Sequence, residues 1–291
     1  MKVRTWLAAG VLAWAWAVQA AGYAVVDAVQ APAWVERNEQ RQPLVPGMEL
    51  RNRDRLLTGP GARAVVQLAD GSAVKLGENS SMAVNALGRR EGRVFTAALD
   101  VAAGAFRFTT DVFQKHLQRR AVNVRAGTLT AGIRGTDLWG KSDSERDLVC
   151  LLEGRIVVSH PQGEAAELSE PLQYYAAAKG QAPGPVAMVG RAELAVWASR
   201  TELQDGVPTL KRGGRWAVAL TTADSQAAAL EVYDRAVASG HAPKIRPVKA
   251  GEESYRYEVL VGQIATQAQA RLLAERLARE LELANPRVVR R

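Results

Sequence analysis

The residue types that usually carry catalysis or bind metals are scarce in this chain, and their spacing supports neither activity. Its three histidines, His116, His160 and His241, stand far apart, and none has a His, Cys or carboxylate partner at the spacing of metal ligands. We also find no paired carboxylates and no Ser/His/Asp arrangement within a supporting motif. The sequence therefore predicts no catalytic residue, no metal site and no cofactor.

Two further stretches resemble reactive motifs and favour a structural interpretation. Cys150, the only cysteine, lies in the apolar run "DLVCLLEGRIVVSH", which is typical of a small buried residue rather than a reactive thiol. The segment "GIRGT", residues 132–136, lacks both the Gly-x-Gly-x-x-Gly spacing and the Gly-Lys-Ser/Thr ending of phosphate-binding loops. Glycines in strands usually mark bulges or close backbone approach, so we expect a bend there.

The N-terminus has the build of a secretory signal peptide over residues 1–20. Lys2 and Arg4 precede an apolar run of 13 residues, and small residues follow at the positions that a signal peptidase reads. A membrane-spanning helix needs about 20 apolar residues, so an uncleaved anchor is the weaker alternative. No later segment approaches that length. We therefore expect a periplasmic protein that begins near Ala21 and has no membrane span after signal cleavage.

The charge of the chain is consistent with an anionic partner. The net charge is +8, and removal of Lys2 and Arg4 would leave +6 on the mature protein. The basic residues are spread along the chain, which is typical of a solvated surface but also favours attraction to an anionic polymer. Because export makes nucleic acid an improbable target, the cell wall or a membrane surface is the better candidate.

The first half of the mature chain, residues 21–178, is predicted to be an all-β domain. Short apolar runs of four to eight residues are separated by turn signals, and no long amphipathic helix interrupts them. Asp70-Gly71 lies between two alternating runs, which predicts a hairpin, and Glu153-Gly154 lies between "LVCLL" and "RIVVS" in a similar pattern. We expect a compact sandwich or roll.

A linker over residues 179–212 separates this domain from the next. It opens with the Pro- and Gly-rich "KGQAPGPVAMVG" and ends within the basic stretch "QDGVPTLKRGGR", residues 204–215, for which we expect a flexible hinge. Between them, "RAELAVWASRTEL" predicts a short helix that docks on one domain through Trp197. The rival interpretation, a helix on a membrane surface, is disfavoured because its polar face carries both Glu and Arg.

Residues 213–291 change rhythm repeatedly. Apolar residues alternate in "RWAVALTT" and "YRYEVLVGQIA", and in the segments that follow each of these they return every three or four positions. The order is strand, helix, strand, strand, helix, strand. We therefore expect an α+β domain with a four-stranded antiparallel sheet and two helices on one of its faces.

The other face of this sheet should lie in water and form the binding surface. An open platform of this kind suits a long, flat ligand better than a small molecule. Thr222 and Arg256 should contribute most, because each can donate hydrogen bonds from the solvent side. The residues that we assign to this surface are Ala217, Ala219, Thr221, Thr222, Arg256, Glu258 and Leu260.

Residues 25–160 resemble FecR domains. The segments that carry the resemblance are "RNRDRLLTGPGARAVVQLADGSAVKLGENSSMAV", "LDVAAGAFRF", "VNVRAGTLTAGIRGTDLWG" and "CLLEGRIVVS", in that order. Residues 133–136 match the Ile-Arg-Gly-Thr motif fully, whereas the usual Gly before Asp54 is missing. The best-known members relay an iron-siderophore signal to a sigma factor. We do not extend that activity to this chain, and many FecR domains instead stand beside wall-binding modules in exported proteins.

Residues 213–291 resemble the SPOR domain, the sporulation-related repeat. "RWAV" matches its opening strand and "YEVLVG", residues 257–262, its third strand, and the second helix carries a similar apolar stripe. The resemblance implies a ribonucleoprotein-type fold that binds peptidoglycan, with a preference for glycan strands stripped of stem peptides, as at division septa. Three positions depart from the family: Ala219 stands where Gln is frequent, Thr221-Thr222 replaces small Ser-containing pairs, and Gln263 replaces Pro.

Three interpretations follow. In the first, the chain is an exported, non-catalytic cell-wall protein that binds peptidoglycan glycan strands, with the FecR-like domain as a scaffold or docking module. In the second, it is an adaptor whose SPOR-like face has lost its sugar and meets another envelope or division protein. The third, a hydrolase, is the weakest, because no catalytic constellation supports it. None of the three involves nucleic acid.

Overall fold

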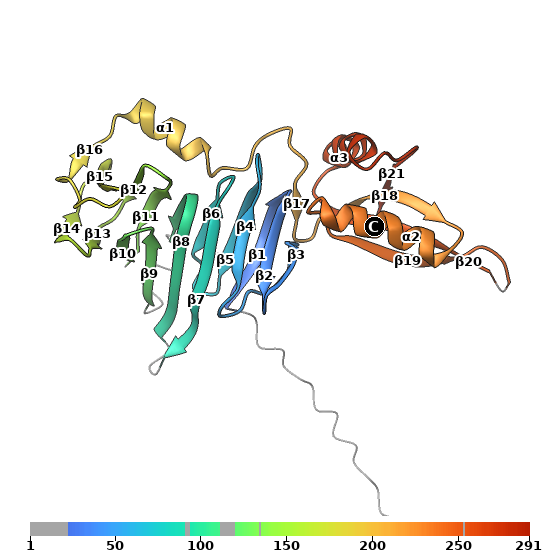
Figure 1. The fold of residues 1–291 in the computed structure, drawn as a ribbon, viewed down its shortest axis with the longest axis horizontal. Coiled ribbons are helices and arrows are strands. Elements are labelled where there is room, and N and C mark those ends of the chain that lie inside the picture. Colours follow the sequence, from blue (N-terminus) through green and yellow to red (C-terminus); the bar gives the residue numbers. More distant parts are fainter. Residues whose placement is uncertain (1–22, 91–93, 111–119, 134, 253) are drawn as a thin grey trace, which may run out of the picture.

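The structure is a computed structural model, and it describes residues 23–90, 94–110, 120–133, 135–252 and 254–291. The expected signal peptide, His116 and Arg134 lie outside the described residues. Within them, two domains follow one another along the chain and are joined by an ordered segment (Figure 1). We refer to residues 23–178 as the β domain, 179–212 as the linker segment and 213–291 as the C-terminal domain.

The β domain is a sandwich of two sheets that share one strand. Sheet A has the order β1-β5-β6-β8-β11-β12-β15, and sheet B the order β3-β2-β4-β7-β8-β9-β10-β13-β14. All pairs are antiparallel except β8 with β9. The strands are β1 (Ala24–Gln30), β2 (Ala33–Arg37), β3 (Gln40–Pro43), β4 (Arg55–Thr58), β5 (Arg63–Leu68), β6 (Ala73–Leu76), β7 (Ser81–Arg90), β8 (Val94–Thr109), β9 (Arg120–Ala126), β10 (Leu129–Ile133), β11 (Asp137–Ser142), β12 (Arg146–Glu153), β13 (Ile156–His160), β14 (Gly163–Leu168) and β15 (Gln173–Ala178).

The core of the β domain lies between the two sheets, and this confirms the predicted all-β architecture. Alternating side chains of the strands point inward, as period-2 patterns require. Members from both sheets pack in one continuous apolar cluster, which includes Val26, Leu56, Val66, Phe95, Phe106, Leu138 and Val158.

Strand β8 passes from one sheet into the other at Gly104. Its residues up to Ala103 pair with β7 in sheet B, whereas Gly104 and the residues after it pair with β11 in sheet A. Gly104 has φ +88°, and a Cβ placed on it would lie 2.6 Å from the Cβ of Ser80. Only glycine tolerates both that conformation and that approach.

The two predicted acidic-Gly turns have different roles. Asp70-Gly71 closes the hairpin between β5 and β6 as predicted, with Gly71 at φ +84° and the Asp70 carboxylate accepting from the amide of Ser72 at 3.0 Å. The second expected strand pair is wrong. Glu153-Gly154 lies between β12 and β13, which belong to different sheets and do not pair, so Gly154 is a crossing point between the layers.

The linker segment lies along the outer face of sheet A, where α1 (Arg191–Ser199) follows the short strand β16 (Ala187–Met188). Trp197 is buried and stacks on Trp139 of β11, with ring centroids 5.3 Å apart. Tyr174 meets the same ring edge-on at 6.0 Å. The predicted docking of this helix through Trp197 is therefore confirmed.

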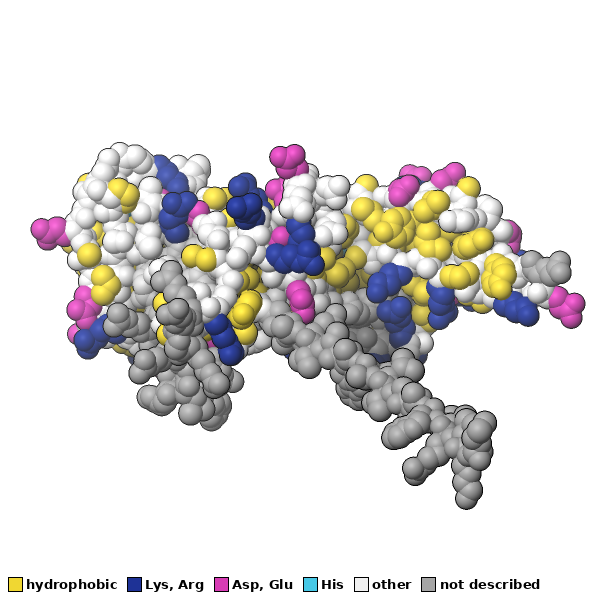
Figure 2. All heavy atoms as spheres, turned by 90° about the horizontal axis from the view of Figure 1, so that it is seen from below, with side chains coloured by type: hydrophobic (Ala, Val, Ile, Leu, Met, Phe, Trp, Pro, Cys, Tyr) yellow, Lys and Arg dark blue, Asp and Glu magenta, His cyan; other side chains and the backbone are white. Residues whose placement is uncertain are grey.

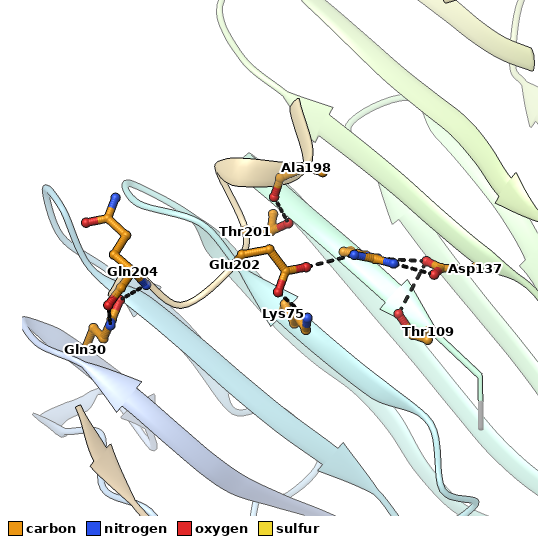
Figure 3. Close-up of polar contacts among 9 residues, drawn as sticks. Gln30, Lys75, Thr109, Asp137, Ala198, Thr201, Glu202 and Gln204 are labelled. Atoms are coloured by element: carbon orange, nitrogen blue, oxygen red, sulfur yellow. Dashed lines mark hydrogen bonds and ion pairs between the residues drawn. The ribbon is translucent and has the colours of Figure 1, made fainter. Parts of the chain in front are cut away.

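Polar contacts fasten the rest of the linker segment, so the expected flexible hinge is ordered instead (Figure 3). Glu202 pairs with Lys75 and with Arg107, whose Nη1 lies 2.8 Å from the carboxylate. Burial raises the pKa of Glu202, but the two cations outweigh this effect and hold the pKa below its usual value. Gln30, which is fully buried, donates to the Gln204 carbonyl at 2.8 Å and accepts from the Gln204 amide at 3.1 Å.

The C-terminal domain has the predicted order of elements. Its sheet has the antiparallel order β19-β20-β18-β21, and both helices pack on one face over a core that includes Val218, Val259, Leu273 and Leu277. Thr266 caps the second helix by accepting from the amide of Gln269 at 3.2 Å. The elements are β18 (Trp216–Ala223), α2 (Gln226–Ala238), β19 (Pro243–Lys249), β20 (Tyr255–Ile264), α3 (Gln267–Glu280) and β21 (Arg287–Arg290).

A two-residue strand, β17 (Leu210–Lys211), connects the sheets of the two domains. Leu210 pairs with Val29 of β1 on one side and with Ile264 of β20 on the other. Sheet A therefore continues through β17 into the sheet of the C-terminal domain. No helix among the described residues is both long and apolar enough to cross a membrane.

Replacing Gly104 by alanine should destabilise the β domain more than the same change at Gly47. The two glycines have nearly equal φ, +88° and +85°, but no atom lies within 4 Å of a Cβ at Gly47. The difference isolates the clash with Ser80, for which we expect an extra loss of about 1–3 kcal/mol in the free energy of unfolding. Urea denaturation followed by circular dichroism measures both variants. Equal losses would show that the β8 crossing tolerates a side chain.

Candidate functional site

The face of the C-terminal sheet opposite the helices is the candidate site, and we call it the open face. Strand register places its residues side by side: Lys244 of β19 pairs with Leu260 of β20, and Leu260 with Ala219 of β18. Ala219 in turn pairs with Arg287 of β21. Because α2 and α3 both lie on the other side, no helix of the C-terminal domain covers this row.

The floor of the open face is apolar and more buried than the sequence suggests. Ala217, Ala219 and Leu260 form a small cluster with Val289, separate from the core under the helices, and the first three are at most 2 % exposed. The expectation that these three lie in water is therefore wrong. Their side chains are shorter than the surrounding Lys and Arg side chains, whose aliphatic stems can cover apolar neighbours. Arg291, for example, lies so close over Gly262 that a Cβ there would be 2.8 Å from its Nη1.

A β-bulge in β18 changes which threonine faces outward. Ala219 pairs with Leu260, and the next pair joins Thr221 to Val259. Between these two pairs, β18 therefore contains one residue more than β20. The bulge reverses the alternation that follows. Thr221 consequently shares the face of the core residue Val259, and its assignment to the open face is wrong. Thr222 pairs with Glu258 and lies on the open face.

Glu258 lies beneath two arginines rather than in contact with solvent. It is 7 % exposed, and its carboxylate accepts from Arg246 Nη2 at 2.6 Å and lies 4.0 Å from Arg287 Nη2. Arg287 also donates to the Thr222 hydroxyl at 3.3 Å. The exposed position expected for Glu258 is therefore corrected: this carboxylate holds the two guanidinium groups in place across the sheet.

Thr222 and Arg256, the two residues expected to contribute most, line the same hollow at one end of the open face. The hollow has a volume of about 680 Å³ and is also lined by Asp224, Val248, Lys249 and Tyr255. Arg256 Nε lies 2.8 Å from Asp224 Oδ1, and both side chains are largely exposed. The structure thus brings together the ends of β18, β19 and β20 around two cations and one carboxylate.

The open face is strongly basic. Among the residues that the structure describes there, two carboxylates, Asp224 and Glu258, accompany a larger set of cations that register and alternation place on this face: Arg215, Lys244, Arg246, Arg256, Arg287 and Arg291. The helices on the opposite side carry both signs of charge. In Figure 2, Lys and Arg side chains gather along one side of the C-terminal domain beside an apolar area. Such a field attracts anions.

The other residues of chemical interest are isolated. Burial raises the pKa of the Cys150 thiol to about 12, so this residue is the buried structural cysteine predicted. His160 Nδ1 accepts from the Gln162 amide at 3.1 Å, and the buried His241 lies 3.9 Å from Glu280. In the part of the chain that the structure describes, no three His, Cys, Asp or Glu side chains gather as a metal site would require.

Comparison with known proteins supports the assignment of the β domain. Residues 54–157 match the model of the family described as FecR protein, so this part of the chain is a FecR domain. Proteins of that family are associated with the cell envelope. No curated protein matches the chain at a significant level.

Two solved structures from Parabacteroides distasonis, both of proteins proposed to be anti-sigma factors, are distantly similar. The first is 13 % identical, with a TM-score of 0.41 over 77 % of this chain and 90 % of that one. The second is 14 % identical, with a TM-score of 0.40 over 69 % of this chain and 96 % of that one.

Replacing Glu258 by glutamine should destabilise the C-terminal domain. The change leaves Arg246 and Arg287 without their shared counter-charge, and hydrogen bonds to charged groups contribute about 1.5–3 kcal/mol, less where one partner is exposed. We expect a loss of about 1–2 kcal/mol in the free energy of unfolding. The matched control is Asp224→Asn, which removes an exposed carboxylate from the same face and should cost less than about 0.5 kcal/mol. Similar losses for both, measured by urea denaturation, would contradict the role assigned to Glu258.

Proposed function

We propose that this chain is an exported, non-catalytic cell-wall protein whose open face binds peptidoglycan glycan strands, with the FecR domain as a scaffold or docking module. The observation that carries the proposal is the open face itself. It presents a row of cations above a buried apolar floor, and no helix of its domain obstructs it.

A surface of this form suits a polymer. A glycan strand is long, rich in hydroxyls and flat-sided, and it must enter and leave a binding site along its length. Small-molecule sites, by contrast, are concave and enclose most of their ligand. On the open face, Arg246, Arg287 and Thr222 offer hydrogen-bonding groups to sugar hydroxyls, and the buried cluster of Ala217, Ala219 and Leu260 supports them from below.

The resemblance to SPOR domains supports the same ligand, and one of its departures has a structural reason. Gln263, which replaces a proline of the family, has φ +64°. Proline is restricted to φ near −65°, so it could not occupy this position with the backbone that the chain adopts. The departure therefore reflects a local change at the end of β20, next to β17, and lies away from Arg256 and Thr222.

An adaptor function is the second candidate. The match of residues 54–157 to the FecR family favours it, because the best-known members of that family relay a signal to another protein. In the linker segment, the exposed side chains of Val186, Met188 and Val196 lie on and near β16 and α1 and would suit a protein partner. Under this proposal the open face would meet a protein in place of a sugar.

Co-sedimentation with purified sacculi tests the proposed function. Residues 21–291 should pellet with sacculi, and treatment with an amidase that removes stem peptides should increase the bound fraction. Replacing both Lys244 and Arg256, which lie on the open face and do not pair with Glu258, by glutamine should weaken binding about tenfold, because charge-assisted hydrogen bonds to the strand are lost.

The control for this experiment is Arg271→Gln together with Arg279→Gln, which removes the same charge from α3 on the opposite side of the domain. It should bind like the unmodified chain, with circular dichroism confirming that all forms are folded. Equal recovery of the unmodified chain with and without sacculi would reject glycan binding and favour the adaptor function.

A further inference from the structure

We infer that the open face recognises the free carboxylates of stripped glycan strands, and that Arg256 binds such a carboxylate in place of Asp224. This inference rests on the proposed function and specifies which chemical group of the polymer is bound. It makes Asp224 an internal competitor for the ligand.

The geometry of the hollow supports this exchange. Arg256 lies at its border with Asp224 against one edge of the guanidinium group, the closest atoms being Nε and Oδ1 at 2.8 Å. Lys249 lines the same hollow and brings a second cation. A carboxylate is thus already the partner of Arg256, and a space of about 680 Å³ beside it can admit another. Guanidinium groups bind carboxylates through two parallel hydrogen bonds, which gives the site its chemical preference.

Asp224 is held weakly enough to be displaced. Its side chain is 83 % exposed and that of Arg256 is 58 % exposed, so water screens their attraction. The buried Glu258 differs, because it is fixed under Arg246 and Arg287 and is not free to leave. Of the two carboxylates on the open face, Asp224 is therefore the one that a ligand can replace.

The chemistry of the polymer supplies the matching group. In peptidoglycan, the stem peptide is joined by an amide bond to the lactyl ether of each muramic acid residue. Removal of the peptide converts each neutral amide linkage into a free carboxylate, so a stripped strand carries regularly spaced negative charges. A basic face distinguishes that strand from a neutral polysaccharide through charge complementarity. Arg246, Arg287 and Lys244 continue the row of cations along the sheet from Arg256.

The decisive experiment varies the ligand and leaves the protein unchanged. Fluorescence anisotropy would compare the binding of residues 21–291 to stripped glycan oligosaccharides, to the same oligosaccharides with their carboxylates coupled to methylamine, and to chitin oligosaccharides of equal length. We expect the free-acid form to bind at least tenfold more tightly than both neutral forms. Its affinity should also fall as salt is added, because exposed charges are screened.

Variants then identify the residues. Arg256→Gln should weaken binding of the free-acid form about tenfold and that of the neutral forms much less, because the neutral forms lose only hydrogen bonds to hydroxyls, whereas Asp224→Asn should strengthen binding of the free-acid form about two- to fivefold. Arg271→Gln on α3 is the control for the loss of one positive charge and should bind like the unmodified chain.

The results separate this inference from the proposed function. Equal affinity for the free-acid and methylamide forms would overturn carboxylate recognition while glycan binding remained. Weaker binding by Asp224→Asn would overturn the exchange with Arg256. Failure of every oligosaccharide to bind would remove the proposed function as well.

Discussion

Backbone pairing through β17 fixes the arrangement of the two domains. A sheet edge presents N–H and C=O groups that need partners, and the two residues of β17 occupy the edge of β1 and the end of β20 at once. Beside it, the amide of the buried Gln30 bonds to Gln204 and to the Thr209 hydroxyl at 3.0 Å. Detaching the linker segment from the β domain would leave these buried groups without partners, at about 1–3 kcal/mol for each. The linker segment is therefore part of the fold.

One buried residue, Glu258, allows many like charges to lie in fixed positions on the open face. Guanidinium groups on neighbouring strands repel one another, and a small apolar floor offers them few contacts. Glu258 resolves this conflict, since a single carboxylate beneath the surface draws Arg246 and Arg287 toward each other across the sheet. The cations in turn shield Ala217, Ala219 and Leu260 from water. Charge and burial on this face depend on each other.

The sequence predicts most elements of the structure. The errors arise where pairing between distant residues determines which strands are neighbours or which face a side chain occupies. Alternation and helical periodicity give the all-β domain, the strand and helix order after Arg215 and the docking role of Trp197. They do not reveal the bulge after Ala219, because an extra residue in a strand does not change the composition. Alternation alone therefore places Thr221 on the wrong face. The sequence likewise does not distinguish the Asp70-Gly71 hairpin from the crossing at Gly154. The pattern in "PKIRPVK", with Lys244 and Arg246 two residues apart, is the signal that could have located the basic rim.

The continuous sheet has a geometric consequence for any polymer that lies on the open face. A glycan strand has a direction, and each molecule bound to it through a flexible tether would display its other domain at random around the strand. Because β17 removes that freedom, every bound copy would present its FecR domain at the same angle and on the same side. Successive copies along one strand would then form an array with a common orientation. A protein that binds the FecR domains could therefore distinguish the two directions of the sugar chain.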